Sequence, residues 1–472
     1  MFFNGMSIFS FNPIVDAGMS TPWVIAEAAP TDASPFILMS VLVSLITVYA
    51  TSKLGGELSK RLDLPPVLGE LVGGVVVGVS FLHLIMFPEN TAAVTDSLIA
   101  RIVQWMGHLD TETALHVFES QSEVISVLAE LGVIVLLFEI GLESDLRELS
   151  KVGAQAAVVA VVGVVVPFAL GTVGLISIFH APVIPAIFAG AALTATSIGI
   201  TSKVLAELGH LKSTEGQIIV GAAVIDDVLG IIVLAVVASL AKTGEVDLLN
   251  VVFLIASATG FLLGSILLGK FFNTGFETIA AKLQTRGAFL IPAFTFALVM
   301  ACLASAIHLE AILGAFAAGL VLDETDKRNE LDQQIMPIAD ILVPIFFVTV
   351  GAKADLSVLN PMVVENREGL IIAAFLIAVA VIGKVVTGWA VFGQPGINRL
   401  AIGVGMVPRG EVGLVFAGIG SASGVLDRPL EAAIIVMVIL TTFLAPPLLQ
   451  LALKGEADDS EVSVAQVASA AD

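Results

Sequence analysis

Charged residues are scarce in this 472-residue sequence: only 13% are Asp, Glu, Lys or Arg, while 57% are hydrophobic. The mean hydropathy of +1.01 is too high for a chain whose whole surface is exposed to water. Apolar runs near the length that crosses a bilayer, about 20 residues, recur from end to end. We therefore exclude a soluble protein and expect one polytopic membrane domain.

Basic residues are scarcer still, because 21 Lys and Arg stand against 42 Asp and Glu, and the formal net charge is −21. This balance excludes a nucleic-acid-binding protein, since phosphate neutralisation depends on Lys and Arg. The single cysteine, Cys302, excludes internal disulfide bonds. Residues 1–35 contain no Lys or Arg and no uninterrupted apolar core, so we expect a retained extracytoplasmic segment rather than a secretory signal peptide.

Gly, Pro and charged clusters divide the apolar runs into about thirteen predicted transmembrane helices. The fold class that follows is an all-α polytopic membrane protein. The predicted spans are 36–52, 65–82, 124–143, 153–178, 183–207, 216–240, 248–270, 286–308, 310–322, 337–352, 368–392, 397–422 and 429–453.

The basic residues are distributed unevenly between the two sets of alternate loops. Of the 21, one set of loops holds 14 and the other holds 5, while Lys384 and Arg409 lie within spans. Because Lys and Arg concentrate in cytoplasmic loops, we expect the N-terminus outside and the acidic tail 454–472 in the cytoplasm. The tail from Glu456 onward is predicted to be disordered.

Two short motifs occur twice in the same order. GLESDL at 141–146 is matched by GAKADL at 351–356, and LG with GG within 68–74 is matched by LG with AG within 313–319. The matching spans run in opposite directions, so we expect inverted repeats, a common architecture of secondary transporters. The expected organisation is a first repeat at 36–240 with an extramembrane loop at 83–123, a linking span at 241–285 and a second repeat at 286–453.

Two adjacent aspartates, Asp226 and Asp227, lie about ten residues from either end of their predicted span and hence near the bilayer midplane. A charged side chain at that depth costs about 2.5–3.5 kcal/mol on insertion scales. Neighbours on a helix point roughly 100° apart, so these carboxylates cannot serve the same contact. One can face a water-filled cavity while the other faces another helix; a purely structural helix contact is the alternative.

Lys384 also lies well inside a predicted span. A buried lysine and a buried aspartate at similar depth are most simply explained as an ion pair. A snorkelling or purely structural lysine is the alternative.

Two segments interrupt otherwise apolar spans. ALTATSIGITS contains Thr196 and Ser197, and VGMVPRGEVG contains Arg409 and Glu411 beside helix breakers. Unwound backbone at membrane depth persists only where it lines a cavity or is buried in protein. Paired interrupted helices therefore indicate a transport site. Ordinary helix packing remains open for the first segment, and a structural Arg409–Glu411 pair for the second.

Together these motifs resemble the monovalent cation:proton antiporter superfamily, over about residues 36–453. The similarity is greater to its second branch, the sodium/proton antiporters of bacterial and cyanobacterial type with thirteen spans. Five motifs carry the resemblance: ELGVIVLLFEIGLE at 130–143, TATSIGIT, the pair Asp226-Asp227, the isolated Lys384, and MVPRGEVG at 406–413.

The resemblance implies roles for the charged residues. Asp227 is the implied ion-binding and proton-exchanging carboxylate, and Asp226 the aspartate that pairs with Lys384. Both aspartates are implied ligands of Na⁺.

The resemblance also implies two crossed, discontinuous helices. Thr196 and Ser197 fall in the first, next to the site, and Arg409 and Glu411 fall in the second. The family fold implies a core bundle of spans four to six and eleven to thirteen, which moves against a dimer-forming scaffold built from the other spans.

The predicted function is a secondary active sodium/proton antiporter that works by alternating access. If sodium at Asp227 weakens the pair between Asp226 and Lys384, the lysine can release a second proton and the exchange is electrogenic. A potassium/proton antiporter is the alternative, followed by a cation channel and an intramembrane aspartyl protease. The protease is disfavoured because its two aspartates must come from different helices.

No metal-cluster, nucleophile or phosphate-loop signature occurs in the sequence, so we expect neither an enzyme nor a cofactor. The expected partners are Na⁺ and H⁺, with Li⁺ or K⁺ as alternative ions, the lipid bilayer, and a second copy of the chain in a homodimer. The expected location is the bacterial inner membrane, or the thylakoid membrane for a cyanobacterial protein.

The loop 83–123 contains an amphipathic pattern. Leu98, Ile102, Val103 and Met106 follow helical spacing and predict a surface helix. The loop histidines could sense pH from outside, although solvated loop histidines are more common. They are His83, His108 and His116.

Overall fold

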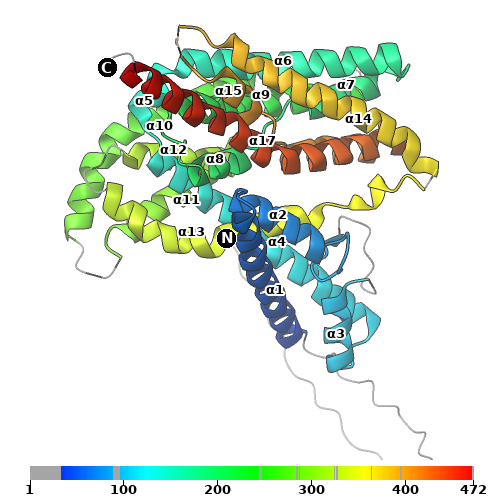
Figure 1. The fold of residues 1–472 in the computed structure, drawn as a ribbon. Helices are drawn as coiled ribbons and strands as arrows, with labels where there is room; N and C mark the ends of the chain where they lie inside the picture. Colours follow the sequence, from blue (N-terminus) through cyan, green and yellow to red (C-terminus); the bar gives the residue numbers. More distant parts are fainter. Residues whose placement is uncertain are drawn as a thin grey trace, which may run out of the picture.

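The computed structural model describes residues 33–88, 96–243, 247–282, 285, 287–323, 325, 328–362, 364–393 and 396–469. Within these ranges the chain forms helices joined by short turns, and no β-strand occurs among them (Figure 1). The α-helices are α1 Ser34–Arg61, α2 Pro66–Val77, α3 Leu98–Gly107, α4 Thr111–Glu143, α5 Leu146–Lys151, α6 Gly153–Ile178, α7 Val183–Ala192, α8 Ile198–Glu207, α9 Thr214–Thr243, α10 Leu248–Lys282, α11 Leu290–Ala306, α12 Ala311–Asp323, α13 Arg328–Lys353, α14 Val364–Val385, α15 Arg399–Gly405, α16 Glu411–Ala422 and α17 Arg428–Ser469.

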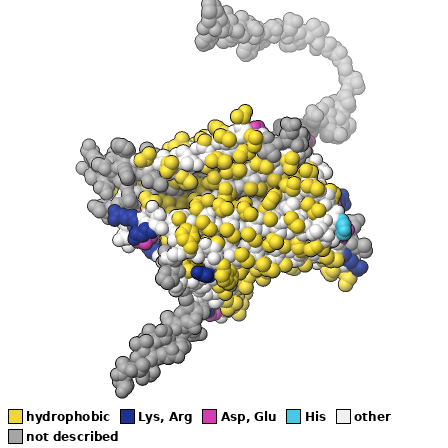
Figure 2. All heavy atoms as spheres, turned by 90° about the horizontal axis from the view of Figure 1, so that it is seen from above, with side chains coloured by type: hydrophobic (Ala, Val, Ile, Leu, Met, Phe, Trp, Pro, Cys, Tyr) yellow, Lys and Arg dark blue, Asp and Glu magenta, His cyan; other side chains and the backbone are white. Residues whose placement is uncertain are grey.

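The helices match the predicted spans. Among the described residues, eight helices are long and apolar enough to cross a membrane, and five shorter helices are also apolar. Each of the thirteen predicted spans overlaps one of them, and two spans are broken, one into α7 and α8 and the other into α15 and α16. Figure 2 shows apolar side chains over most of the face seen from above, as a lipid-facing surface requires. The predicted all-α, polytopic fold is confirmed.

Several helices extend beyond the apolar spans predicted for them. α1 continues to Arg61, α4 begins at Thr111 and α13 begins at Arg328. The predicted disordered tail instead continues α17 to Ser469. Hydropathy marks where apolar side chains end, whereas a helix ends where its backbone hydrogen bonds find another partner. At the start of α4, for example, the Asp110 side chain accepts a hydrogen bond from the Thr113 amide.

The segment predicted as an extramembrane loop contains α3 and the first turns of α4. A helix at this place is confirmed, and three of the four apolar residues that predicted it are exposed. Val103 is buried, whereas Leu98, Ile102 and Met106 are 40–54% exposed; Ile99 and Ala100 are buried instead. Periodicity finds the helix but cannot tell an apolar face packed on protein from one that faces outward. His83 and His108 occupy left-handed turns with φ of 51° and 47°.

The repeated motifs pack against each other reciprocally through two glycine pairs. A Cβ added to Gly74 of α2 would lie 2.9 Å from the Cα of Gly351 in α13. A Cβ added to Gly141 of α4 would lie 3.0 Å from the Cα of Gly319 in α12. In each half, the helix with the LG motif (α2 or α12) therefore packs on the helix of the other half that ends in the GAKADL or GLESDL motif (α13 or α4), as inverted repeats should.

Two groups of helices can be distinguished. One apolar cluster joins α6, α7, α9, α14, α16 and α17 through buried residues such as Leu175, Phe188 and Met437. In Figure 1, α6, α7, α14 and α17 lie together in the upper part, while α1 to α4 and α11 to α13 lie below them. We call the first group the core bundle (α6 to α9 and α14 to α17) and the second group the scaffold (α1 to α4 and α10 to α13).

Candidate functional site

Two unwound segments meet in the middle of the protein. The first, 193–197, separates α7 from α8, and the second, 406–410, separates α15 from α16. The Ser197 amide donates to the Pro408 carbonyl at 2.9 Å, and the Thr196 hydroxyl donates to the Met406 carbonyl at 3.1 Å. Backbone groups that lost their helical partners are thus satisfied across the crossing. The two predicted discontinuous helices are confirmed.

Residue types explain why the chain unwinds here. Pro408 cannot donate a backbone hydrogen bond. A Cβ at Gly410 would lie 3.0 Å from the Ser197 hydroxyl, so glycine permits the close approach.

Arg409 holds the crossing from inside. Its side chain is fully buried, and its Nη1 donates to the carbonyl of Ala195 in the first unwound segment. The Thr442 hydroxyl of α17 donates to the Arg409 carbonyl at 2.6 Å. Arg409 therefore connects both unwound segments. Glu411 begins α16, and its side chain lies outside the described residues, so the alternative Arg409–Glu411 pair is not tested.

The structure brings Asp226 and Lys384 together. Lys384 Nζ of α14 lies 3.1 Å from Asp226 Oδ2 of α9, and both side chains are 0% exposed. The predicted ion pair is present, and the burial of Lys384 rules out snorkelling. Lys384 lies in the last turn of α14, just before the chain tightens into the 3₁₀ segment Val386–Ala390. Gly163 of α6 leaves room for the ammonium group, because a Cβ there would lie 3.2 Å from Nζ.

Asp227 faces a different environment from its neighbour. It is 5% exposed and lines a cavity of about 10 Å³ beside Ala195, Thr196 and Ser197 of the first unwound segment. Such a volume holds about one water-sized particle. Asp226 is absent from that lining, in agreement with the rotation of about 100° between neighbours on a helix. The predicted residues Asp227, Thr196 and Ser197 thus share one cavity, and Asp226 faces Lys384.

Sequence reasoning missed a second carboxylate at this cavity. Glu310, directly before α12, lines the same space as Asp227. Its signal in the sequence is a charge at the first position of the short apolar span 310–322.

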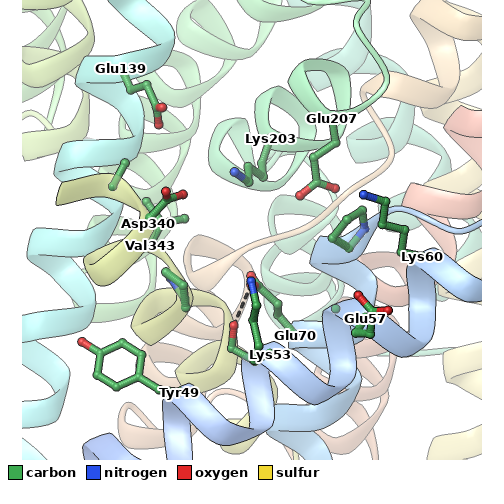
Figure 3. Close-up of a pocket in the computed structure, with 15 residues that line it drawn as sticks. Tyr49, Lys53, Glu57, Lys60, Glu70, Glu139, Lys203, Glu207, Asp340 and Val343 are labelled. Atoms are coloured by element: carbon green, nitrogen blue, oxygen red, sulfur yellow. Dashed lines mark hydrogen bonds between the residues drawn. The ribbon is translucent and has the colours of Figure 1, made fainter. Parts of the chain in front are cut away.

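A second, larger cavity of about 590 Å³ has a strongly charged lining (Figure 3). Glu139 projects from α4, Lys203 and Glu207 from α8, and Asp340 from α13. Glu70 of α2 accepts a hydrogen bond from the Ser52 hydroxyl at 2.8 Å. In the sequence, this cavity is indicated by acidic residues inside predicted spans: Glu70, Glu139 and Asp340.

The two cavities follow the same three helices. α4 contributes Val133 to the small cavity and Glu139 to the large one, and α8 contributes Gly199 and Lys203 in the same way. α13 lines both as well. The two cavities therefore lie next to the same three helices, one lined by Asp227 and the other by charged side chains.

A scan against protein families matches residues 24–455 to the sodium/hydrogen exchanger transmembrane family. The chain belongs to this family. It is 62% identical over 430 residues to the high-affinity Na(+)/H(+) antiporter NhaS3 of Synechocystis, covering 91% of this chain and 93% of that protein. It is also 32% identical to the Na(+)/H(+)-K(+) antiporter GerN of Bacillus cereus, covering 85% of this chain and 94% of GerN.

The solved structure of the sodium proton antiporter MjNhaP1 from Methanocaldococcus jannaschii shares the fold. The TM-score is 0.58 at 18% identity, and the match covers 89% of this chain and 99% of that one. The likeness therefore extends over nearly all of the helices described above.

Proposed function

We propose that this protein exchanges Na⁺ for H⁺ across a membrane and that Asp227 binds either ion in turn. The observation that carries the proposal is the small cavity at the crossing, where the buried carboxylate residue Asp227 lies beside the hydroxyl residues Thr196 and Ser197. A hard monovalent cation prefers such oxygen ligands, and the same carboxylate can hold a proton instead. The two ions therefore compete for one group.

Alternating access follows from the arrangement of the helices. The core bundle carries Asp227 and the crossing, and the scaffold faces them across the cavity. In the conformation described, the large polar cavity provides the approach for a hydrated cation. Movement of the core against the scaffold would close this approach and open another on the opposite side.

The ion pair between Asp226 and Lys384 couples the binding of Na⁺ to the release of a proton. We place Asp226 beside the ion path as the partner of Lys384. When Na⁺ reaches Asp227, the pair weakens and Lys384 releases its proton. Two protons then move against one Na⁺, and the exchange responds to voltage. Thr196 and Ser197 position the oxygens around the ion, and Arg409 with Glu411 stabilises the second crossed helix.

We further propose a homodimer formed by the scaffold, with the N-terminus outside, the C-terminus in the cytoplasm, and a location in the bacterial inner membrane or a thylakoid membrane. A K⁺/H⁺ antiporter is the second candidate, and the printed description of GerN, which names K⁺, supports it.

The test uses purified protein in liposomes containing a pH-sensitive dye. Addition of Na⁺ should produce proton movement, and parallel additions of Li⁺ and K⁺ define the selectivity. Asp227→Asn, which keeps the shape but cannot carry a proton, should abolish the signal, whereas Glu148→Gln on the exposed surface of α5 should not. Normal exchange by Asp227→Asn would contradict the proposal, and a response to K⁺ alone would favour the second candidate.

A further inference from the structure

We propose that Glu310 is a specificity-determining residue, a scaffold carboxylate that shares the transported cation with Asp227. The inference rests on the proposed function, since it takes Asp227 as the ion-binding group. Both residues line the cavity of about 10 Å³, one from the scaffold and one from the core.

The depth of Glu310 supports this role. α12 has 13 residues and is about 20 Å long, whereas the hydrocarbon layer is about 30 Å thick. A helix this short leaves at least one of its ends within the thickness of the bilayer, and the half-buried Glu310 stands directly before its first residue. A carboxylate at membrane depth is costly unless it faces a polar site, which makes a functional role the default interpretation.

Glu310 lies on the side of the small cavity away from the polar approach. At the opposite end of α12, Asp323 accepts a hydrogen bond from the Leu146 amide at 3.4 Å, near the end of α4. Glu139, close to the same end of α4, lines the large cavity, and Val133 lines the small one. A cation that enters past Glu139 therefore meets Asp227 and Glu310 together at the closed end of its path.

The buried charges explain why a second carboxylate helps. Among the described residues, four charged residues are no more than 5% exposed, and with all four ionised their charges sum to zero. They are Asp226, Asp227, Lys384 and Arg409. Until Lys384 releases its proton, an added monovalent cation leaves this set positive, and the charge of Glu310 offsets that excess. Because Glu310 belongs to the scaffold, its charge compensates the cation only while the core bundle is placed so that Asp227 and Glu310 line the same cavity.

The experiment compares Glu310→Gln with the native protein and with Glu148→Gln, on the exposed surface of α5, in liposomes. We expect the apparent KM for Na⁺ to rise roughly tenfold in Glu310→Gln, as loss of one charged ligand implies, while the maximal rate changes little. The preference for Na⁺ over K⁺ should also fall. A merely structural role would lower the maximal rate for both ions equally.

A second variant covers the case in which the glutamine protein does not fold. Glu310→Asp keeps the charge but withdraws the oxygens by one methylene, so its KM should lie between those of the native protein and Glu310→Gln. Native KM and native selectivity in the folded variants would overturn the inference. Asp227→Asn run in parallel separates the two proposals: if it is inactive while both Glu310 variants behave as native, only the role of Glu310 fails.

Discussion

Lys384 Nζ lies 3.1 Å from Asp226 Oδ2, and neither side chain is exposed. The two groups come from α14 and α9, 158 residues apart in the chain. An ion pair this deeply buried is costly to form, and removing one partner leaves the other charge uncompensated.

The first prediction concerns the stability of this pair. Lys384→Gln and Asp226→Asn should each lower the free energy of unfolding by about 3–5 kcal/mol, because each leaves one buried charge unpaired. The double variant should recover much of the loss. Thermal unfolding in detergent of all four proteins forms the double-mutant cycle, and strictly additive losses would argue against the pair.

The second prediction concerns stoichiometry. If Lys384 releases a proton when Na⁺ binds, each cycle moves one net charge, worth about 2.3 kcal/mol per 100 mV. At fixed Na⁺ and H⁺ gradients, the net exchange measured in liposomes should then change direction at a defined membrane potential. Lys384→Gln should shift the exchange toward electroneutral or stop it. A balance point of the native protein that ignores voltage would refute two-for-one exchange.

The third prediction concerns the crossing. Gly410→Ala places a Cβ 3.0 Å from the Ser197 hydroxyl and should displace Ser197 from the cavity. We expect slower Na⁺-driven proton movement and a loss of stability of about 1–3 kcal/mol, as overpacking typically causes. Gly418→Ala in α16 is the matched control, since nothing lies within 4 Å of its added Cβ. Equal effects of the two substitutions would show that the crossing tolerates the added methyl group.

The fourth prediction concerns pH and the extramembrane end of α4. Hydrogen bonds donated by the Thr113 hydroxyl and amide lower the pKa of Asp110 from its ordinary value. The ionised cap therefore stabilises the first turn above the unfolded pKa, and this stability is lost as the pH falls through the lower, folded pKa. Hydrogen exchange of amides 111–115, corrected for intrinsic rates, should increase in that acidic range. Asp110→Asn keeps a capping side chain without a titrating group, so its protection should not depend on pH there.

The sequence by itself determined which residues belong to the membrane and which of them are exceptional. Hydropathy depends on residue type and local order, so the apolar part of every span could be predicted. The breaks around Thr196 and Pro408 were predictable because hydroxyls, proline and glycine stand inside apolar runs. The pairing of Lys384 with Asp226 followed from the cost of leaving either charge alone in the bilayer.

Only the tertiary structure decided which side chains meet across helices. Glu310 and Asp227 share a cavity because α12 and α9 border the same crossing, and hydropathy contains no information on which helices are neighbours. The exposed face of α3 and the charged cavity around Glu139 and Lys203 escaped prediction for the same reason. A span's apolar pattern records that a side chain avoids water, and packing alone decides whether it meets lipid, another helix or the path of an ion.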